Sequence, residues 1–134
     1  MQKNEPMVLL RMPQRRTLDE DNYADVANQI MEGRERRFPK LTTSKLRGIY
    51  GYIMNVYTRA DTPEEFEKCR SEIQYLKVRM AYESGRDKDV KEFIQVSYLL
   101  KALDNVKTYD QFRLYCRYAE SLVAYFKFYG GRDK

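Results

Sequence analysis

The sequence predicts an all-α fold, a compact bundle of about five helices. Apolar residues recur at three- and four-residue spacing through most of the 134 residues, and threonine-led capping sequences precede several of these stretches. No stretch alternates between apolar and polar residues for long enough to predict a strand. Connections of a few residues between the last three predicted helices make neighbouring helices antiparallel, so we expect one bundle domain with a sizeable core.

The N-terminal region predicts an arm followed by two helices. Residues 1–16 combine prolines, arginines and a short apolar patch without a sustained period, which predicts a flexible basic arm ahead of a helical-bundle domain at residues 17–134. The capping box at Thr17–Glu20 predicts the start of a first helix, because its side chains satisfy backbone N–H groups that are otherwise unpaired. After Pro39, a second helix is expected over residues 43–60.

The second half of the chain predicts three further helices. Thr62–Glu65 is a capping box with proline at the first helical position, and its helix runs to about Ser84, with Gly85 as a left-handed terminator. A fourth helix spans about residues 89–106. A fifth begins at the capping sequence Thr108–Gln111 and stops at a pair of glycines.

The composition narrows the classes of function. With 25 lysines and arginines against 20 aspartates and glutamates, the chain carries a formal charge of +5, which favours phosphate-bearing partners and would also attract it to membranes. The chain has no histidine, the commonest general base near neutral pH. Cys69 and Cys116 lack the paired spacing of a metal or redox motif, so we expect two buried, reduced thiols rather than a disulfide, with no metal and no cofactor.

Two further classes are disfavoured. The apolar patch at Met7–Leu10 is too short to span a bilayer or to form a secretory core, so we expect a soluble, cytoplasmic protein. The acid pairs at Asp19–Glu20 and Glu64–Glu65 are explained by helix starts, and no serine has a histidine to activate it. The sequence therefore predicts no catalytic residues, and a nuclease centre built from scattered acids is the less favoured alternative.

A candidate phosphate site lies at the start of the second predicted helix. Its hydroxyl residues are Thr42, Thr43 and Ser44, and no acid occupies the first turn. Lys45 and Arg47 add positive charge beside the unpaired N–H groups, and such a helix end suits a phosphate. The alternative is that one of the two threonines simply caps the helix and that the cations face water.

Two glycines on the same helix, Gly48 and Gly51, lie opposite much of its apolar stripe. Each costs about 1 kcal/mol relative to alanine, so something is expected to approach this surface closely. A nucleic-acid strand, a neighbouring subunit or another helix of the same bundle would each explain them.

The third predicted helix interleaves cations with aromatic rings away from its core stripe. The residues are Tyr75, Arg79, Tyr82 and Arg86, with Lys77 nearby. Such a surface could hold phosphates on its cations while bases stack on its rings. It is equally typical of an amphipathic helix whose tyrosines cover the edge of the core and whose arginines reach into solvent.

The last predicted helix is too aromatic for a single narrow stripe. Arg113, Arg117 and Lys127 lie on one side, with tyrosines and a phenylalanine around the flanks. The extra apolar area favours contact on more than one face, and a partner protein is the preferred explanation. The alternative is that this is the central helix of the bundle.

Three stretches carry a family resemblance. They read LTTSKLR at residues 41–47, YLKVRMAYESGR at residues 75–86 and FRLYCRYAESLVAYFKFYGGRDK at residues 112–134. In this order they resemble the small subunit of type III-A CRISPR effector complexes. The resemblance implies a non-catalytic helical protein that stacks in several copies beside repeating backbone subunits and a large subunit. It also implies contact with target RNA and the guide–target duplex through their backbones, in support of antiviral defence.

The matching motifs imply particular RNA contacts. The foremost candidates are Lys45 and Arg47, followed by Arg79 and Arg86; the weaker ones are Lys77, Arg117 and Lys127. The alternative is a helical adaptor that joins other subunits without touching RNA. A basic bundle resting on an anionic membrane is disfavoured, because the cationic residues are not segregated opposite an apolar anchor.

Overall fold

A computed structural model describes residues 8–13 and 16–133 of the chain. This part forms a two-stranded hairpin, seven α-helices and one 3-10 helix, so the prediction of a mostly helical, compact fold is confirmed. In chain order the elements are β1 (Leu9–Met12), β2 (Arg16–Asp19), α1 (Tyr23–Glu32), α2 (Arg34–Arg37), α3 (Thr43–Tyr57), α4 (Pro63–Lys68), α5 (Arg70–Arg86), α6 (Lys88–Ser97), the 3-10 helix η1 (Lys101–Asn105) and α7 (Tyr109–Phe128).

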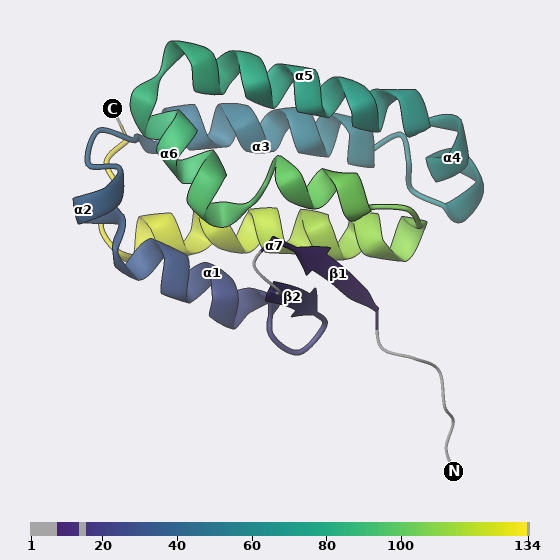
Figure 1. Ribbon diagram of the computed structural model, residues 1–134, viewed down its shortest axis with the longest axis horizontal. Coiled ribbons are helices and arrows are strands. Elements are labelled where there is room, and N and C mark those ends of the chain that lie inside the picture. The colour runs from purple at the N-terminus through teal and green to yellow at the C-terminus, as the bar shows by residue number, and fades with distance from the viewer. Residues whose placement is uncertain (1–7, 14–15, 134) are drawn as a thin grey trace.

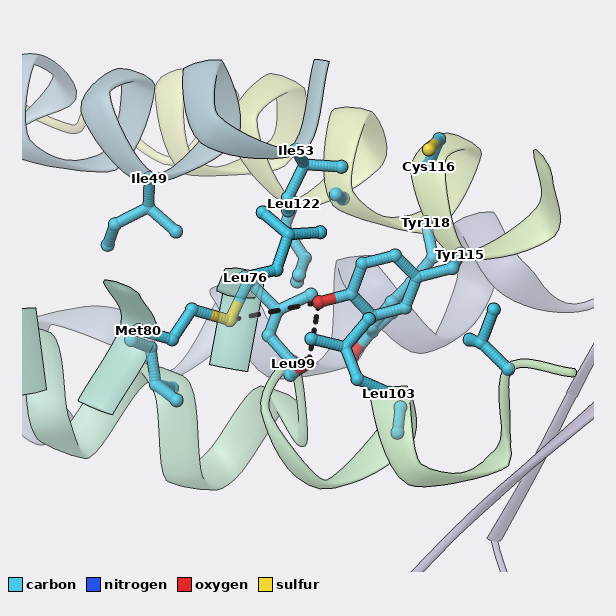
Figure 2. Packing of buried hydrophobic residues seen from close by; sticks show 14 of the residues in the cluster. Ile49, Ile53, Leu76, Met80, Leu99, Leu103, Tyr115, Cys116, Tyr118 and Leu122 are labelled. Carbon is cyan, nitrogen blue, oxygen red and sulfur yellow. Dashed lines mark hydrogen bonds between the residues drawn. The ribbon is translucent and has the colours of Figure 1, made fainter. Parts of the chain in front are cut away.

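The longest helix, α7, organises the packing. It contacts α1, α3, α4 and β1, while α3 lies between α7 and α5 (Figure 1). α5 also packs against α6. Tyr115 and Tyr118 of α7 are fully buried in the core that these helices enclose (Figure 2). The central position of α7 therefore explains much of its aromatic content without a partner protein.

Two buried tyrosines of α7 hold the turn that follows α6. The Tyr115 hydroxyl donates a hydrogen bond to the backbone oxygen of Leu99 (Figure 2). The Tyr118 hydroxyl donates to the backbone oxygen of Ser97 over 2.9 Å. Between these carbonyls, Tyr98 is left-handed with a φ of 61°, a conformation that is uncommon for residues other than glycine. The turn is thus held by a hydrogen bond on each side.

Part of the predicted N-terminal arm, residues 1–16, forms a strand. Leu9–Met12 is a strand, and Leu10 and Met12 are buried in the core, so the assignment of residues 1–16 to a flexible segment was wrong over this stretch. Residues 1–7 and 14–15 lie outside the described part of the chain. The strand pairs antiparallel with β2, which sets Leu10 opposite Leu18. Four-residue strands are too short to show a period of two, so the sequence gives little sign of them.

The capping box expected at Thr17–Glu20 does not begin a helix. Most of this stretch is β2, and α1 begins only after Asn22. The Asn22 side chain accepts a hydrogen bond from the Asp19 N–H and donates one to the Thr17 carbonyl. The prediction was wrong because pairing with β1 supplies the backbone partners that a helix would otherwise supply.

Two of the predicted helices are each divided. Cys69, with a ψ of 15°, separates α4 from α5, and α5 continues past Gly85, which is therefore not a terminator. Tyr98 separates α6 from η1, so the helix expected over residues 89–106 ends near its middle. A single residue in another conformation leaves the apolar spacing nearly unchanged, which is why the sequence reads as continuous.

The predicted ends of α7 are confirmed. The capping box that begins at Thr108 is reciprocal. At the other end Gly130 has a φ of 84°, and the N–H groups of Gly130 and Gly131 donate to the carbonyls of Lys127 and Phe126, which is a Schellman motif. A Cβ atom on Gly131 would collide with the Phe126 ring. Glycine is therefore required where the chain turns back over the end of α7.

Candidate nucleic-acid interface

α3 begins with the hydroxyl residues that were predicted to bind phosphate. Oγ1 of Thr42 accepts the Lys45 N–H over 3.2 Å, so Thr42 caps the helix. The Thr43 N–H donates to the carbonyl of Arg132 over 2.6 Å, which places the chain after α7 across this helix end. Thr43 is buried and Ser44 is exposed. Because two of the first N–H groups have partners within the chain, this end offers a phosphate less than an open helix terminus would.

Three of the predicted RNA contacts are lysines, and each one forms an ion pair within the chain. The pairs are Lys45–Asp87 at 2.6 Å, Lys77–Asp104 at 2.8 Å and Lys127–Asp133 at 2.6 Å. Hydrogen bonding from Lys45 and from backbone N–H groups at the start of α6 lowers the pKa of the Asp87 carboxyl. A phosphate that bound these lysines would therefore compete with carboxylates of the protein itself.

The predicted arginines differ from the lysines. Among the described residues, no carboxylate lies within 4.0 Å of the guanidinium of Arg47, Arg79 or Arg117. Arg86 approaches Glu83 at 3.7 Å, the longest ion-pair distance among the described residues. The arginine charges are thus more available to an external anion than the lysine charges are.

Tyrosine rings position the Arg79 guanidinium. Its central carbon lies 4.1 Å from the ring centre of Tyr52 on α3 and 6.0 Å from that of Tyr75 on α5. The Arg79 Nε atom is buried and has no hydrogen-bond partner within the described chain. The Tyr52 hydroxyl in turn donates to Glu83 over 3.1 Å. Contacts of this kind limit the orientations of a planar guanidinium.

Two clefts flank the outer ridge of α3. One, of about 250 Å³, lies toward α5 and is lined by residues that include Gly51, Tyr52 and Arg79. The other, of about 220 Å³, lies toward α7 and is lined by residues that include Arg113 and Arg117. The exposed ridge of α3 together with these clefts is called the α3 face below. The face therefore has arginines on both sides of one helix.

Gly48 and Gly51 lie on this ridge and are exposed. A Cβ atom added to either glycine would meet no atom within 4 Å in the described structure. Close packing against another helix of the same bundle is therefore not the reason for these glycines, and that alternative was wrong. A partner from outside the chain remains as an explanation for them.

The structure brings some of the predicted residues together and separates others. Arg47, Arg79 and Arg117 belong to the α3 face, and Arg86 continues it along α5. Lys77 lies on the other edge of α5, in a cleft shared with Asp104 of η1. Tyr52 was not among the predicted residues, although it follows Lys45 by seven residues along one edge of the same helix, which was the available signal.

The described residues contain no cluster of three or more histidine, cysteine or acidic side chains that could hold a metal ion. Cys69 and Cys116 are buried free thiols, as predicted, and burial raises the pKa of both. None of the described helices combines the length and hydropathy needed to cross a bilayer.

The fold and the α3 face define a small, mostly helical protein with a surface of arginines and tyrosines suited to a polyanion or to partner subunits. Residues 19–132 match the model of the family described as Csm2 Type III-A. The chain belongs to this family, whose members are small subunits of the type III-A CRISPR effector complex, so the family resemblance of the sequence is confirmed.

Similar proteins span most of the chain. A protein from Streptococcus thermophilus named CRISPR system Cms protein Csm2 is 35% identical over 119 residues, which cover 87% of this chain and 98% of that protein. A protein of the same name from Enterococcus italicus is 47% identical over 98 residues, covering 69% of this chain and 70% of its own length. A third, from Mycobacterium tuberculosis, is 31% identical over 121 residues.

Proposed function

We propose that this chain is a non-catalytic, cytoplasmic small subunit that binds the backbone of target RNA and of the guide–target duplex. The observation that carries the proposal is the group of arginines on the α3 face, Arg47, Arg79 and Arg117, which have no carboxylate within 4.0 Å in the described part of the chain. Guanidinium groups bind phosphate oxygens bidentately. Because base pairing carries the sequence information in RNA-guided systems, charge and shape suffice for such a subunit.

The proposal includes packing against the repeating backbone subunits, the large subunit and further copies of this chain. Gly48 and Gly51 support it, since neither carries a side chain and open space lies beside both, where a strand or a neighbouring subunit could approach the backbone of α3. Phe128, at the end of α7, supports a protein contact because its side chain is 74% exposed. Exposed aromatic residues of this kind are common anchors of protein interfaces.

The test is a titration of fluorescent RNA with the Arg47→Ala/Arg117→Ala double variant at several salt concentrations, on the isolated chain and on the reconstituted complex. We expect weaker binding and a shallower dependence of the logarithm of affinity on the logarithm of salt concentration, by about 0.7 for each lost phosphate contact to a single strand. The matched control is Lys91→Ala/Lys101→Ala, which removes two exposed cations from α6 and η1.

The adaptor alternative predicts a different result. If the subunit only joins other proteins, the arginine variant binds RNA like the wild type in both settings, with the same salt dependence. Equal losses in the arginine variant and the lysine control would also contradict the proposal, because they would indicate a general effect of net charge. Intact labelled RNA after incubation with the purified chain is expected for a non-catalytic subunit.

A further inference from the structure

One edge of α5 carries the same pair of side chains twice. The Arg79 guanidinium lies 6.0 Å from the ring centre of Tyr75, and the Arg86 guanidinium lies 5.5 Å from that of Tyr82. Each arginine follows its tyrosine by four residues, and the second pair follows the first by seven. Seven residues advance an α-helix by about 10 Å, so the two pairs lie in line at roughly that spacing. We call these four residues the tyrosine–arginine edge.

The rings of this edge are open to solvent. Tyr75 is 57% exposed and Tyr82 is 62% exposed, and Val78, between them along the helix, is 57% exposed. These three make up most of the exposed large hydrophobic side chains in the described structure. α5 packs against α3, α4 and α6 through its other sides. Tyr75, Val78 and Tyr82 thus form a strip of apolar surface that the fold leaves uncovered.

The charges beside the rings favour an anion. Both carboxylates of α5 have partners already: Glu72 pairs with Arg59, and Glu83 accepts a hydrogen bond from Tyr52 and lies near Arg86. The described structure therefore places no unengaged carboxylate of α5 among the rings. Guanidinium groups that lie over one face of exposed rings, with no unengaged acid of α5 beside them, match a ligand that has both phosphates and flat apolar surfaces.

We infer that the tyrosine–arginine edge binds unpaired nucleotides, with bases stacked on Tyr75 and Tyr82 and phosphates held by Arg79 and Arg86. This inference rests on the proposed RNA-binding function and adds that the RNA bound at this edge is unpaired. In a duplex the base faces are covered by neighbouring bases, whereas unpaired bases can stack on aromatic side chains. A duplex therefore contacts the arginines alone, and a single strand contacts the arginines and the rings.

The test compares two RNA probes on the full chain: an unstructured single strand that contains 2-aminopurine, and the same strand annealed to its complement. The variant is Tyr75→Leu/Tyr82→Leu, which keeps apolar bulk at exposed positions and removes no charge. We expect its affinity for the single strand to fall about thirtyfold or more, since each stacked base contributes at least about fivefold. Its affinity for the duplex and the salt dependence of binding should stay unchanged.

Two companions sharpen the experiment. Phe128→Leu removes an even more exposed ring from α7 and should leave both affinities unchanged. Arg79→Lys keeps the charge but loses the planar group beside Tyr52 and Tyr75, so it should weaken single-strand binding more than Arg47→Lys does. Quenching of 2-aminopurine by the wild type, lost in the double tyrosine variant, would show stacking directly.

Several results would overturn the inference. Equal losses for single strand and duplex, no loss for either, or the same loss in Phe128→Leu would each exclude stacking at this edge. A tyrosine variant that loses contact with the other subunits but binds RNA normally would identify the edge as a protein surface. A wild-type chain that binds no single strand at low salt also overturns it, because the rings are exposed in the isolated chain. The proposed function is then still tested by the arginine variants in the reconstituted complex.

Discussion

Two tyrosines of α7, Tyr115 and Tyr118, and the two tyrosines of α5 have opposite surroundings. Tyr115 and Tyr118 are fully buried, and their hydroxyl groups donate to backbone carbonyls on either side of a left-handed turn. Tyr75 and Tyr82 are more than half exposed, and guanidinium groups lie beside their rings. The first pair stabilises the fold, whereas the fold leaves the apolar area of the second pair uncovered. Aromatic content alone thus says little about function until burial and the nearest charge are known.

Tyr118→Ala should give the largest effect. Removal of a fully buried ring leaves a cavity and deprives the Ser97 carbonyl of its donor, so the free energy of unfolding should fall by about 3–5 kcal/mol. Urea denaturation followed by circular dichroism measures the change. The exposed counterpart, Tyr82→Ala, should stay within about 0.5 kcal/mol of the wild type. Comparable losses in both variants would remove the contrast between the two helices.

Tyr115→Phe isolates the hydroxyl group from the ring. The phenylalanine keeps the packing but leaves the Leu99 carbonyl without the donor it has now, which should cost about 1–3 kcal/mol of stability. Tyr82→Phe is the matched control and should be neutral, because its ring is mostly exposed. A neutral Tyr115→Phe would indicate that the turn at Tyr98 is held by packing rather than by this hydrogen bond.

Asp87→Ala tests the ion pair of Lys45, one of the cations that have an acidic partner within the chain. Asp87 caps α6 and pairs with Lys45, so its loss should cost about 1 kcal/mol at pH 7. The carboxyl pKa is lower in the folded chain than its usual value near 3.9, so its contribution is complete above pH of about 4 and disappears as the pH falls through the folded pKa. The stability difference from the wild type should therefore shrink in acid. Asp87→Asn, which can still cap the helix, is the control, and a difference that persists at low pH would contradict the ion-pair account.

Tyr75→Leu should have the smallest effect on stability, within about 0.5 kcal/mol, because the ring is 57% exposed. Thermal unfolding of the free chain measures this change. A large loss of stability would show that Tyr75 supports the fold, through Arg79 and Tyr52. Tyr75 would then resemble the buried tyrosines Tyr115 and Tyr118 of α7.

Much of the helical plan was predictable because its signals are local. Thr42, Thr62 and Thr108 each cap a helix in the structure, and the glycine pair ends α7 as expected. The hairpin was not predictable in the same way, since β1 and β2 are short and depend on each other and on α7. Tyr98 gave no sequence signal, because its conformation is held by hydroxyl groups that come from a later helix.

In the candidate site, too, local features were predictable from the sequence and contacts between distant residues were not. The sequence identifies which residues are cationic, and its helical spacing placed Arg79 and Tyr75 together. It does not reveal which cations have acidic partners, because Asp87 lies far along the chain from Lys45, and the two meet only in the folded structure. The three lysines predicted to contact RNA, Lys45, Lys77 and Lys127, are therefore less available to a phosphate than the arginines around α3.

The contacts of β1 have a consequence for synthesis of the chain. Nε2 of Gln111 donates to the Leu9 carbonyl over 3.0 Å, across a separation of 102 residues. A ribosome that adds 5–20 residues per second makes these partners roughly five to twenty seconds apart. During that interval the nascent strand lacks its contact with α7, and the turn at Tyr98 lacks both of its tyrosine donors. Translation that halts before Tyr109 would therefore leave an incomplete core exposed to chaperones and proteases.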